Sequence, residues 1–364
     1  MATVAGDLVG IHATDPASVY LGAFARVDGL THADMARALY EERSLLKVLG
    51  MRRTMFATTA EIAAIINSAV TRTIAQTERK RLLQMLAGVG IAENVEGWVA
   101  DVEAQTVAAL DELGEATATQ LTKLVPGLRV QIPFGEGKKW GGKFGVSTRM
   151  LFLLAAEARV IRGRPRGSWL SSMYAWAPMD RWVPTGLVDM PLHEAQAELV
   201  RRWLAAFGPG TLRDIQWWTG WTVGTTKQAL KDAGAVEVAL DEGTGYSLAD
   251  DIEQTTDPGP WVALLPALDT TTMAWKERAW YLGNLERRLF DSAGNAGPTV
   301  WVDGRIVGGW AVRADGEVVY QLLEDVGRVS SNAVALEAAR IRDWIGASRF
   351  IPRFRTPLEV ELGA

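Results

Sequence analysis

The chain has no cysteine among its 364 residues, so disulfides, thiolate zinc sites and cysteine nucleophiles are all excluded. It has only three histidines, and because they are scattered along the sequence we expect no metal site and no cofactor. No apolar run is long enough to span a membrane, and no basic-then-apolar signal segment is present. These absences predict a cytoplasmic protein that works away from the membrane.

An excess of positive charge is also missing, because 38 Lys and Arg residues face 43 Asp and Glu residues and the net charge is −5. Bulk charge therefore does not indicate a nucleic-acid-binding protein, although a local basic patch can still bind phosphates. Hydrophobic residues make up 48% of the chain, which at this length is enough for a sizeable core. The sequence predicts a globular protein of several structural units, and we expect a monomer.

The order helix, helix, strand pair recurs three times, and this order is typical of a winged helix-turn-helix. The usual first helix of the first copy is predicted to be missing, because the chain begins too close to His12. Thr31, Thr117 and Thr211 each stand where a helix N-cap is expected. The three copies are expected in residues 1–95, 96–182 and 183–256.

The pattern changes near Pro258, where short strand-like segments are separated by glycines. The pair Asp303-Gly304 between two apolar runs predicts a hairpin turn. Residues 330–346 have the pattern of a helix. We therefore predict an α+β fold, mainly α, in which tandem winged helix-turn-helix units precede a small β-rich, barrel-like unit with a C-terminal helix in residues 257–364.

One stretch, "RVIRGRPRG" at 159–167, concentrates positive charge on or beside a predicted wing. Such a cluster can bind phosphates, or it can be an ordinary solvated surface. A loop rich in Gly and Lys lies just upstream, at 133–145, and it is not a P-loop because it lacks the strand and the Gly-Lys-Ser/Thr ending. The basic residues of the two segments are Lys138, Lys139, Lys143, Arg159, Arg162, Arg164 and Arg166.

Several blocks resemble the AlkZ/YcaQ group of bacterial DNA glycosylases, and the resemblance covers nearly the whole chain. The blocks are "LVGIHATDPASVYLGAFAR", "MRRTMFATT", "FGPGTLRDIQWWTGW", "LPALDTTTMAWKERAWYLG", "GPTVWVDGRIVGGWA" and "RFRTPLEVEL". The resemblance implies tandem winged helices, double-stranded DNA carrying alkylated purines as the partner, and excision of bulky N7-alkylated purines. It also implies that some members unhook interstrand crosslinks.

The resemblance gives His12 and Thr14 a role, because the family has Gln, an apolar residue, then Gln or Asp at the matching segment. Those side chains hold the water that attacks the sugar, and here His12 and Thr14 replace them. A neutral His can orient and deprotonate a water, with a reference pKa of about 6.5, and a Thr hydroxyl can hold the same water. Asp15 either orients the ring or caps the next helix, and Pro16 directly after it favours the cap.

Other candidates are fewer and each has a structural alternative. Lys276 and Arg278 can clamp phosphates around the lesion or pair on the surface. Arg52 and Arg53 alternate in a predicted strand, so only one can face a DNA cleft, and we assign Arg53 to DNA. His32 and His193 are predicted to be structural, and the tryptophans of "WWTGW" to belong to the core.

Two functions follow from these observations. The first is a monofunctional DNA glycosylase that hydrolyses the bond to an alkylated purine, since no Lys at the motif is available for Schiff-base lyase chemistry. The second is a non-catalytic winged-helix DNA-binding protein, a regulator or lesion sensor, in which His12 and Thr14 mark the loss of the reaction.

Overall fold

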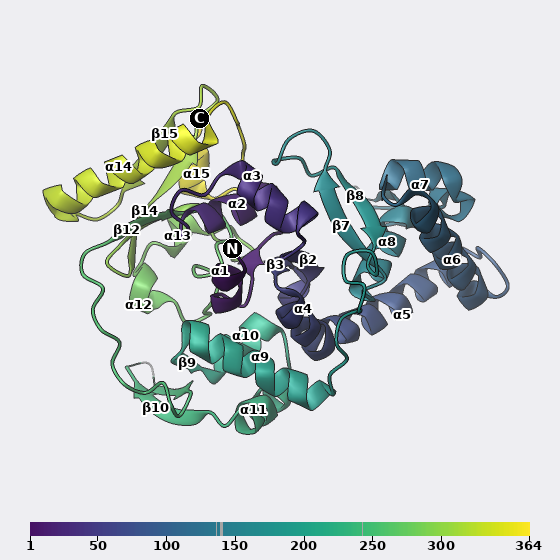
Figure 1. Cartoon of the computed structure of the whole chain (residues 1–364), viewed down its shortest axis with the longest axis horizontal. Helices are drawn as coiled ribbons and strands as arrows, with labels where there is room; N and C mark the ends of the chain where they lie inside the picture. Colours follow the sequence, from purple (N-terminus) through teal and green to yellow (C-terminus); the bar gives the residue numbers. More distant parts are fainter. Residues whose placement is uncertain (136, 139–140, 242) are drawn as a thin grey trace.

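The structure, a computed structural model, describes residues 1–135, 137–138, 141–241 and 243–364. It mixes helices and small sheets, and Figure 1 shows the N-terminal elements near the centre of the molecule. Residues from about 72 to 178 extend to the right, residues from about 192 to 247 lie below, and the C-terminal part lies at the upper left. The N-terminal segment is therefore the part against which the others pack.

The same element order occurs three times: a helix, a two-residue strand, two helices and a pair of strands, with the last strand pairing to the short one. The first copy has sheet order β1-β3-β2 and comprises α1 (Ala2–Asp7), β1 (Ile11–His12), α2 (Pro16–Phe24), α3 (His32–Ala36), β2 (Leu46–Leu49) and β3 (Met55–Thr58). The second has order β4-β8-β7 and comprises α6 (Val95–Leu113), β4 (Ala116–Thr117), α7 (Ala118–Leu124), α8 (Val146–Ala156), β7 (Val160–Pro165) and β8 (Tyr174–Pro178). The third has order β10-β11-β9 and comprises α9 (Leu192–Phe207), β9 (Gly210–Thr211), α10 (Leu212–Thr219), α11 (Val223–Asp232), β10 (Val236–Leu240) and β11 (Gly243–Ser247).

Helices join the first two copies, and a hairpin interrupts the second. The connection contains α4 (Ala60–Ile66), a π-helical segment Asn67–Thr71 and α5 (Arg72–Gly88). The hairpin of β5 (Gln131–Phe134) and β6 (Gly142–Gly145) lies between α7 and α8. It occupies the Gly and Lys rich segment that the sequence assigned to a loop, so that assignment was wrong where the two strands pair.

The predicted threonine caps are confirmed. Thr31, Thr117 and Thr211 each accept a hydrogen bond from the backbone N–H three residues on, and the side chain at that third position bonds back to the N-cap N–H. This reciprocal capping box satisfies N–H groups that a helix start otherwise leaves unpaired. Its local sequence pattern fixes where α3, α7 and α10 begin.

The predicted absence of a helix before His12 was wrong. Residues 2–7 form α1, and Ala5 on this helix is fully buried while the following Val9 also enters the core. Six residues suffice because burial of one apolar side of the turn supplies the stability that so short a helix lacks alone. The segment therefore has a helix before its first short strand, as the other two copies do.

The C-terminal part holds an open sheet rather than a barrel. Strands β12 (Val262–Leu265), β13 (Thr299–Val302), β14 (Arg305–Val312) and β15 (Val318–Leu322) pair antiparallel in that order, so among the described strands β12 and β15 are edges. The predicted hairpin is confirmed, since Asp303 and Gly304 join β13 to β14 with φ of 47° and 83°. The remaining helices are α12 (Ala279–Leu282), α13 (Glu286–Leu289), α14 (Gly327–Ile345) and α15 (Pro357–Leu362).

Buried side chains link segments that are far apart in sequence. One apolar cluster joins Phe56 of β3 to Trp203 of α9 and Tyr281 of α12. A second joins Tyr20 of α2 to Trp310 of β14. The N-terminal segment thus shares its core with the third copy and with the C-terminal sheet, and their contact fixes where β1 lies.

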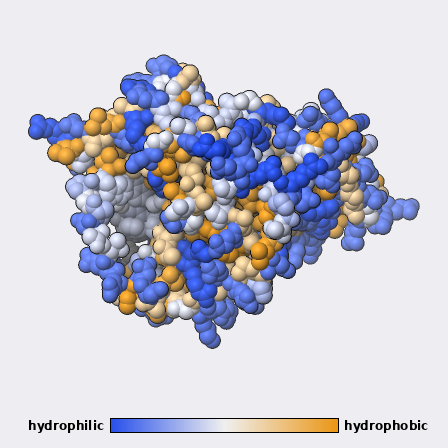
Figure 2. Space-filling model, in the orientation of Figure 1, coloured by the Kyte–Doolittle hydropathy of each residue, from blue (hydrophilic) through white to orange (hydrophobic). Residues whose placement is uncertain are grey.

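The surface carries isolated apolar patches. In Figure 2 hydrophobic residues form separate patches on a mainly hydrophilic face, and one lies on the projecting helix α14, where Val329 and Leu336 are 80% and 74% exposed. Within the described ranges no helix has both the length and the apolar character needed to cross a bilayer.

Candidate active site

His12 lies in a two-residue strand whose position is fixed from both sides. In β1, Ile11 and His12 pair with Ala57 and Phe56 of β3, and the imidazole meets the Phe56 ring edge-on at a centroid distance of 5.4 Å. The backbone N–H of His12 donates to Oγ1 of Thr270 at 2.9 Å. The ring is 6% exposed, and its Nδ1 has no hydrogen-bond partner in the described part of the chain.

Burial changes the protonation of His12. Desolvation in the core and, to a smaller extent, the positive charge of Arg52 lower the pKa of the imidazole to about 4, although Asp269 partly offsets them. The ring is therefore neutral near pH 7, and a neutral imidazole can accept a proton. The sequence suggested the ordinary value of 6.5, which the buried environment does not allow.

A small cavity of about 60 Å³ opens beside this ring. A volume of this size exceeds the roughly 10–15 Å³ that one water needs, and its lining carries several polar groups. The cavity can therefore hold water against a neutral base. It is lined by His12, Thr14, Met51, Arg52, Thr54, Phe56, Trp218, Leu268, Thr270, Met273, Asn295 and Phe354.

Thr14 lies at the junction of this cavity and a larger one of about 630 Å³, and lines both. Its Oγ1 accepts a hydrogen bond from the backbone N–H of Met55 at 3.0 Å, and the N–H of Ala13 donates to the Met55 carbonyl at 2.7 Å. Because the hydroxyl accepts from the backbone, its own proton stays available to a molecule in either cavity.

Asp15 caps α2, as predicted. One carboxylate oxygen accepts from the N–H of Ala17 at 2.9 Å, with Pro16 at the first helical position. The other oxygen accepts from the N–H of Arg353 at 2.7 Å. Both oxygens are engaged with backbone groups, so Asp15 does not orient the imidazole of His12.

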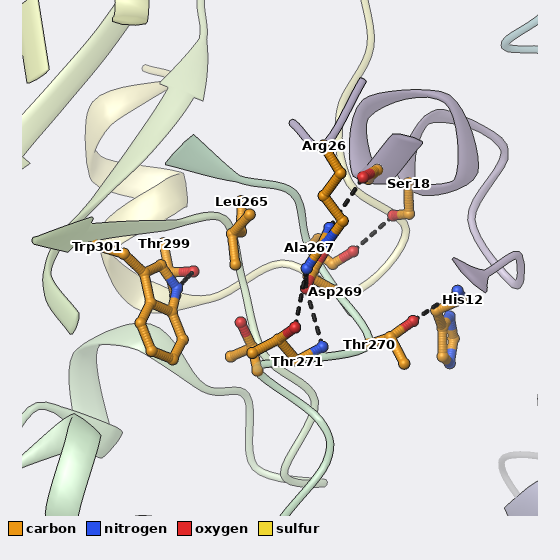
Figure 3. Close-up of polar contacts among 12 residues, drawn as sticks. His12, Ser18, Arg26, Leu265, Ala267, Asp269, Thr270, Thr271, Thr299 and Trp301 are labelled. Atoms are coloured by element: carbon orange, nitrogen blue, oxygen red, sulfur yellow. Dashed lines mark hydrogen bonds and ion pairs between the residues drawn. The ribbon is translucent and has the colours of Figure 1, made fainter. Parts of the chain in front are cut away.

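The loop after β12 holds the site together, and the sequence analysis gave it no role. Figure 3 shows this loop between α2 and His12. Asp269 receives two parallel hydrogen bonds from the Arg26 guanidinium at 2.8 and 2.9 Å, and Ser18 of α2 donates to the carbonyl of Ala267 at 2.6 Å. Thr270 follows directly and contacts β1. The signal was the block "LPALDTTTMAW" itself, whose Asp-Thr-Thr-Thr run is unusual in an apolar segment.

Comparisons with known proteins identify the family of this chain. A family model described as DNA glycosylase AlkZ-like matches residues 5–344. The chain belongs to this family. The resemblance drawn from the sequence is therefore confirmed.

The individual matches are to a curated relative and to a solved structure, both from Streptomyces sahachiroi. A relative named interstrand DNA cross-link repair glycosylase is 28% identical over 166 residues, which is 43% of this chain and 44% of that protein. The match thus spans less than half of the relative. The solved structure of DNA glycosylase AlkZ has a TM-score of 0.72 at 22% identity, covering 96% of this chain and 92% of that one, so the two share a fold.

In this AlkZ-like chain, Arg52 and Arg53 do not alternate in a strand, so that prediction was wrong. Both lie in a 3-10 turn with left-handed φ of 53° and 62°, which turns their side chains in directions a strand would not allow. Arg53 pairs with Glu78 at 3.2 Å. Arg52 lines the His12 cavity and stacks on Trp217 at 3.9 Å, a placement that the sequence analysis missed.

The basic cluster of the predicted wing divides by its partners. Arg159 pairs with Glu103 at 3.1 Å, and Arg164 pairs with Glu41 at 2.8 Å. Arg162 has no carboxylate partner among the described ion pairs, and stacks on Tyr174 at 4.7 Å instead. The charge that can attract an anion is therefore concentrated at Arg162.

The remaining basic residues lie elsewhere. Lys138 and Lys143 are exposed near the β5–β6 hairpin, and Lys139 lies outside the described residues. Arg278 is 5% exposed and stacks on Phe290 at 4.4 Å, with Nε and Nη1 buried and unpaired. The alternative of ordinary surface pairing is therefore wrong for Arg278. Lys276 is half-buried.

The other aromatic and histidine predictions are resolved by burial. His32 stacks on Trp169 at 4.7 Å, as a structural residue would. His193 is exposed at the start of α9, and its structural role stays a prediction. Trp218 is 3% exposed and belongs to the core. Within the described ranges, no three His, Asp or Glu residues are placed to hold a metal ion.

Proposed function

We propose that this chain is a monofunctional DNA glycosylase that hydrolyses the N-glycosidic bond of bulky or N7-alkylated purines in double-stranded DNA. Membership of the AlkZ-like family supports the class of enzyme. The observation that carries the mechanism is the neutral, unpaired imidazole of His12 beside a water-sized cavity. Because one relative is named for cross-link repair, we extend the proposed substrates to interstrand crosslinks.

The proposed chemistry needs a positioned water rather than an acid. An N7-alkylated purine is cationic, so the base leaves with the electrons of the glycosidic bond without being protonated first. His12 accepts a proton from the water while the water oxygen forms its bond to the sugar carbon. Thr14 donates its hydroxyl proton to the same water and fixes the direction of attack. No Lys lines the His12 cavity in the described structure, which favours hydrolysis over lyase chemistry.

One element order recurs three times along the chain. This recurrence supports the proposal that the chain consists of tandem winged helix-turn-helix units and binds DNA as a monomer. We keep the unit boundaries at 95, 182 and 256 as part of this proposal. The 630 Å³ cavity at Thr14 shares Thr148, Arg162, Ser172 and Tyr174 with a neighbouring cavity of about 920 Å³. A continuous groove therefore leads from the His12 strand across the second unit, and we propose that DNA follows it.

The proposed phosphate contacts differ in how much charge they offer. Arg53 and Arg162 line the 920 Å³ cavity, and Arg162 has no carboxylate to release first. Arg159 and Arg164 must share their charge with Glu103 and Glu41, so we expect smaller contributions from them.

Lys276 and Arg278 complete the proposed set, and the charge of Arg278 acts on Arg52, which lines the His12 cavity. The unpaired guanidinium of Arg278 lies 5.3 Å from the Trp217 ring on which Arg52 also stacks. Burial and, to a smaller extent, the positive charge of Arg278 lower the pKa of Arg52 to about 10, so an approaching phosphate would relieve the repulsion between the two arginines.

Release of free 7-methylguanine from methylated DNA tests the proposal. Under single-turnover conditions, we expect His12→Ala to lower the rate by about 10² to 10⁴-fold, with DNA affinity unchanged. Thr14→Ala should lower the rate with little effect on binding. His193→Ala is the matched control, because His193 is exposed and away from the cavity.

Three outcomes would contradict the proposal. Tight DNA binding by the unaltered protein without base release would favour the non-catalytic DNA-binding protein. A folded His12→Ala variant that keeps the full rate would remove His12 from the mechanism. Strand cleavage without alkali would contradict the monofunctional assignment.

A further inference from the structure

The 630 Å³ cavity next to Thr14 is built from three cations and several aromatic rings. Lys47 reaches it from β2, Arg162 from β7, and Arg353 from the segment before α15. Tyr40 and Tyr174 form part of its walls. A cavity of this size is in the range of ordinary ligand sites.

The cations of this cavity lack carboxylate partners. No ion pair in the described part of the chain involves Lys47, Arg162 or Arg353, whereas the neighbouring Arg164 pairs with Glu41. Asp15 is the one acidic residue in the described lining, and its two oxygens already accept backbone N–H groups. The charges of Arg162 and Arg353, and that of Lys47 when it is protonated, repel one another in this partly buried cavity, and an anion would offset that repulsion.

We propose that this cavity binds a phosphodiester of the DNA strand beside the nucleotide at His12, and that binding takes up a proton at Lys47. This inference rests on the proposed function for the identity of the anion. Its geometry follows from Thr14, which lines the cavity of His12 and the cavity of Lys47 and so places the two sites next to each other.

The environment of Lys47 explains why anion binding takes up a proton at this residue. Burial and, to a smaller extent, the charge of Arg162 lower the pKa of its ammonium to about 7. Its Nζ donates to the Tyr40 hydroxyl at 2.6 Å and lies 4.7 Å from the centre of that ring. The free protein therefore holds Lys47 largely unprotonated at pH 8, and a phosphodiester would raise its pKa again.

The other groups that face Lys47 do not account for the proton uptake. Burial raises the pKa of Tyr20, Tyr40 and Tyr174, so all three phenols stay neutral. The arginines that face the cavity or the Tyr40 ring remain cationic throughout, and the one lining carboxylate is already hydrogen-bonded. These other facing groups are Asp15, Arg162, Arg164 and Arg353.

Calorimetry of the full chain with a duplex that carries a non-hydrolysable abasic analogue tests the proposal. Measured at pH 8 in two buffers of different ionisation enthalpy, the protein should take up about one proton per duplex. The affinity should also rise as the pH falls from 8.5 to 7.5, by up to about tenfold per pH unit.

Two substitutions at Lys47 separate the uptake of a proton from the contribution of the positive charge to phosphate binding. Lys47→Arg keeps a permanent charge, so it should bind at least as tightly at pH 8 and take up no proton. Lys47→Met should take up none and reduce the slope of log affinity against log salt by about 0.9. Lys80→Met on α5 is the control, because Lys80 is exposed and outside the cavity lining. Equal proton uptake by Lys47→Met and the unaltered protein would overturn the proposal.

A titration with inorganic phosphate at constant ionic strength is the second arm. If the protein takes up a proton when it binds free phosphate but none when it binds the duplex, the cavity binds an anion other than DNA. That result would also overturn the proposal. Because binding needs no base release, failure of the glycosylase reaction with intact proton uptake would contradict the proposed function alone. Base release that depends on His12, without proton uptake, would contradict this inference alone.

Discussion

The hydroxyl oxygen of Thr270 accepts a hydrogen bond from the backbone N–H of His12 at 2.9 Å, although 258 residues separate them. The same hydroxyl donates to the carbonyl of Gly10 at 3.0 Å. One side chain thus bonds a backbone group of β1 and the carbonyl of the residue just before it. The C-terminal loop therefore fixes the strand on which the proposed base lies.

Thr270→Val should loosen β1 and lower the rate of base release. The substitution removes the hydroxyl but keeps the volume, so the N–H of His12 and the carbonyl of Gly10 lose their partner in a buried place. Such a loss costs about 1–3 kcal/mol for each group left unpaired. Urea unfolding measures the stability and single-turnover kinetics the rate. Thr270→Ser is the matched control, and a Val variant as active and stable as the Ser variant would contradict the role of this contact.

Asp269→Asn should be among the most destabilising single changes near the site. Asp269 is 3% exposed and makes a two-bond ion pair with Arg26, which lies just after the end of α2. Removing its charge leaves the mostly buried Arg26 guanidinium without a counterion, and the loss of a partner from a buried ion pair costs up to about 3–5 kcal/mol.

The double variant Arg26→Met with Asp269→Asn separates charge from packing. It should recover part of the lost stability in urea unfolding, because no lone charge then remains buried. A double variant that equals the sum of the two single losses would show that the pair is not coupled.

Local patterns in the sequence predicted local features well. The capping boxes of Thr31 and Thr211 need only residues three apart, and the cap at Asp15 needs only Pro16 beside it. A hairpin at Asp303-Gly304 is equally local. These elements are confirmed because the interactions that fix them lie within a few residues.

Features that depend on distant partners could not be predicted. Arg162 and Arg164 look alike in the sequence, but Glu41 neutralises only the second, and a register shift in β7 falls between Arg162 and Pro165. The left-handed turn at Arg52 and the contact of Thr270 with β1 likewise depend on tertiary packing. The identity of the proposed catalytic pair came from resemblance, since spacing alone does not distinguish it.

Arg162→Gln should weaken DNA binding more than Arg164→Gln. Arg162 lines both cavities of the groove without a carboxylate partner, whereas Arg164 is exposed and already paired with Glu41. The first change should reduce the slope of log affinity against log salt by about 0.9, and the second by less. Fluorescence anisotropy over a range of salt concentrations measures both. Equal slopes for the two variants would place DNA outside this groove.

Stability should fall with acid more steeply in the unaltered protein than in His12→Gln. The unfolded chain protonates His12 below about pH 6.5, but the folded chain does so only below about pH 4. Between these values the unfolded state binds more protons, so stability is lost as the pH falls through this window. The difference at pH 5 is about 2 kcal/mol. Urea unfolding at pH 5 and pH 8 measures it, and equal losses would show that His12 titrates normally.

The rate of base release should depend on the same titration. As a base, His12 must be neutral, so the rate should rise with pH through about pH 4 and be level from about pH 5 upward. His12→Gln has no titrating ring, so its residual rate should be flat across that range. Reactions without enzyme at each pH correct for acid-catalysed depurination. An inflection near pH 6.5 in the unaltered protein would show a solvated imidazole, and one near pH 4 that persists in His12→Gln would assign the base to another residue.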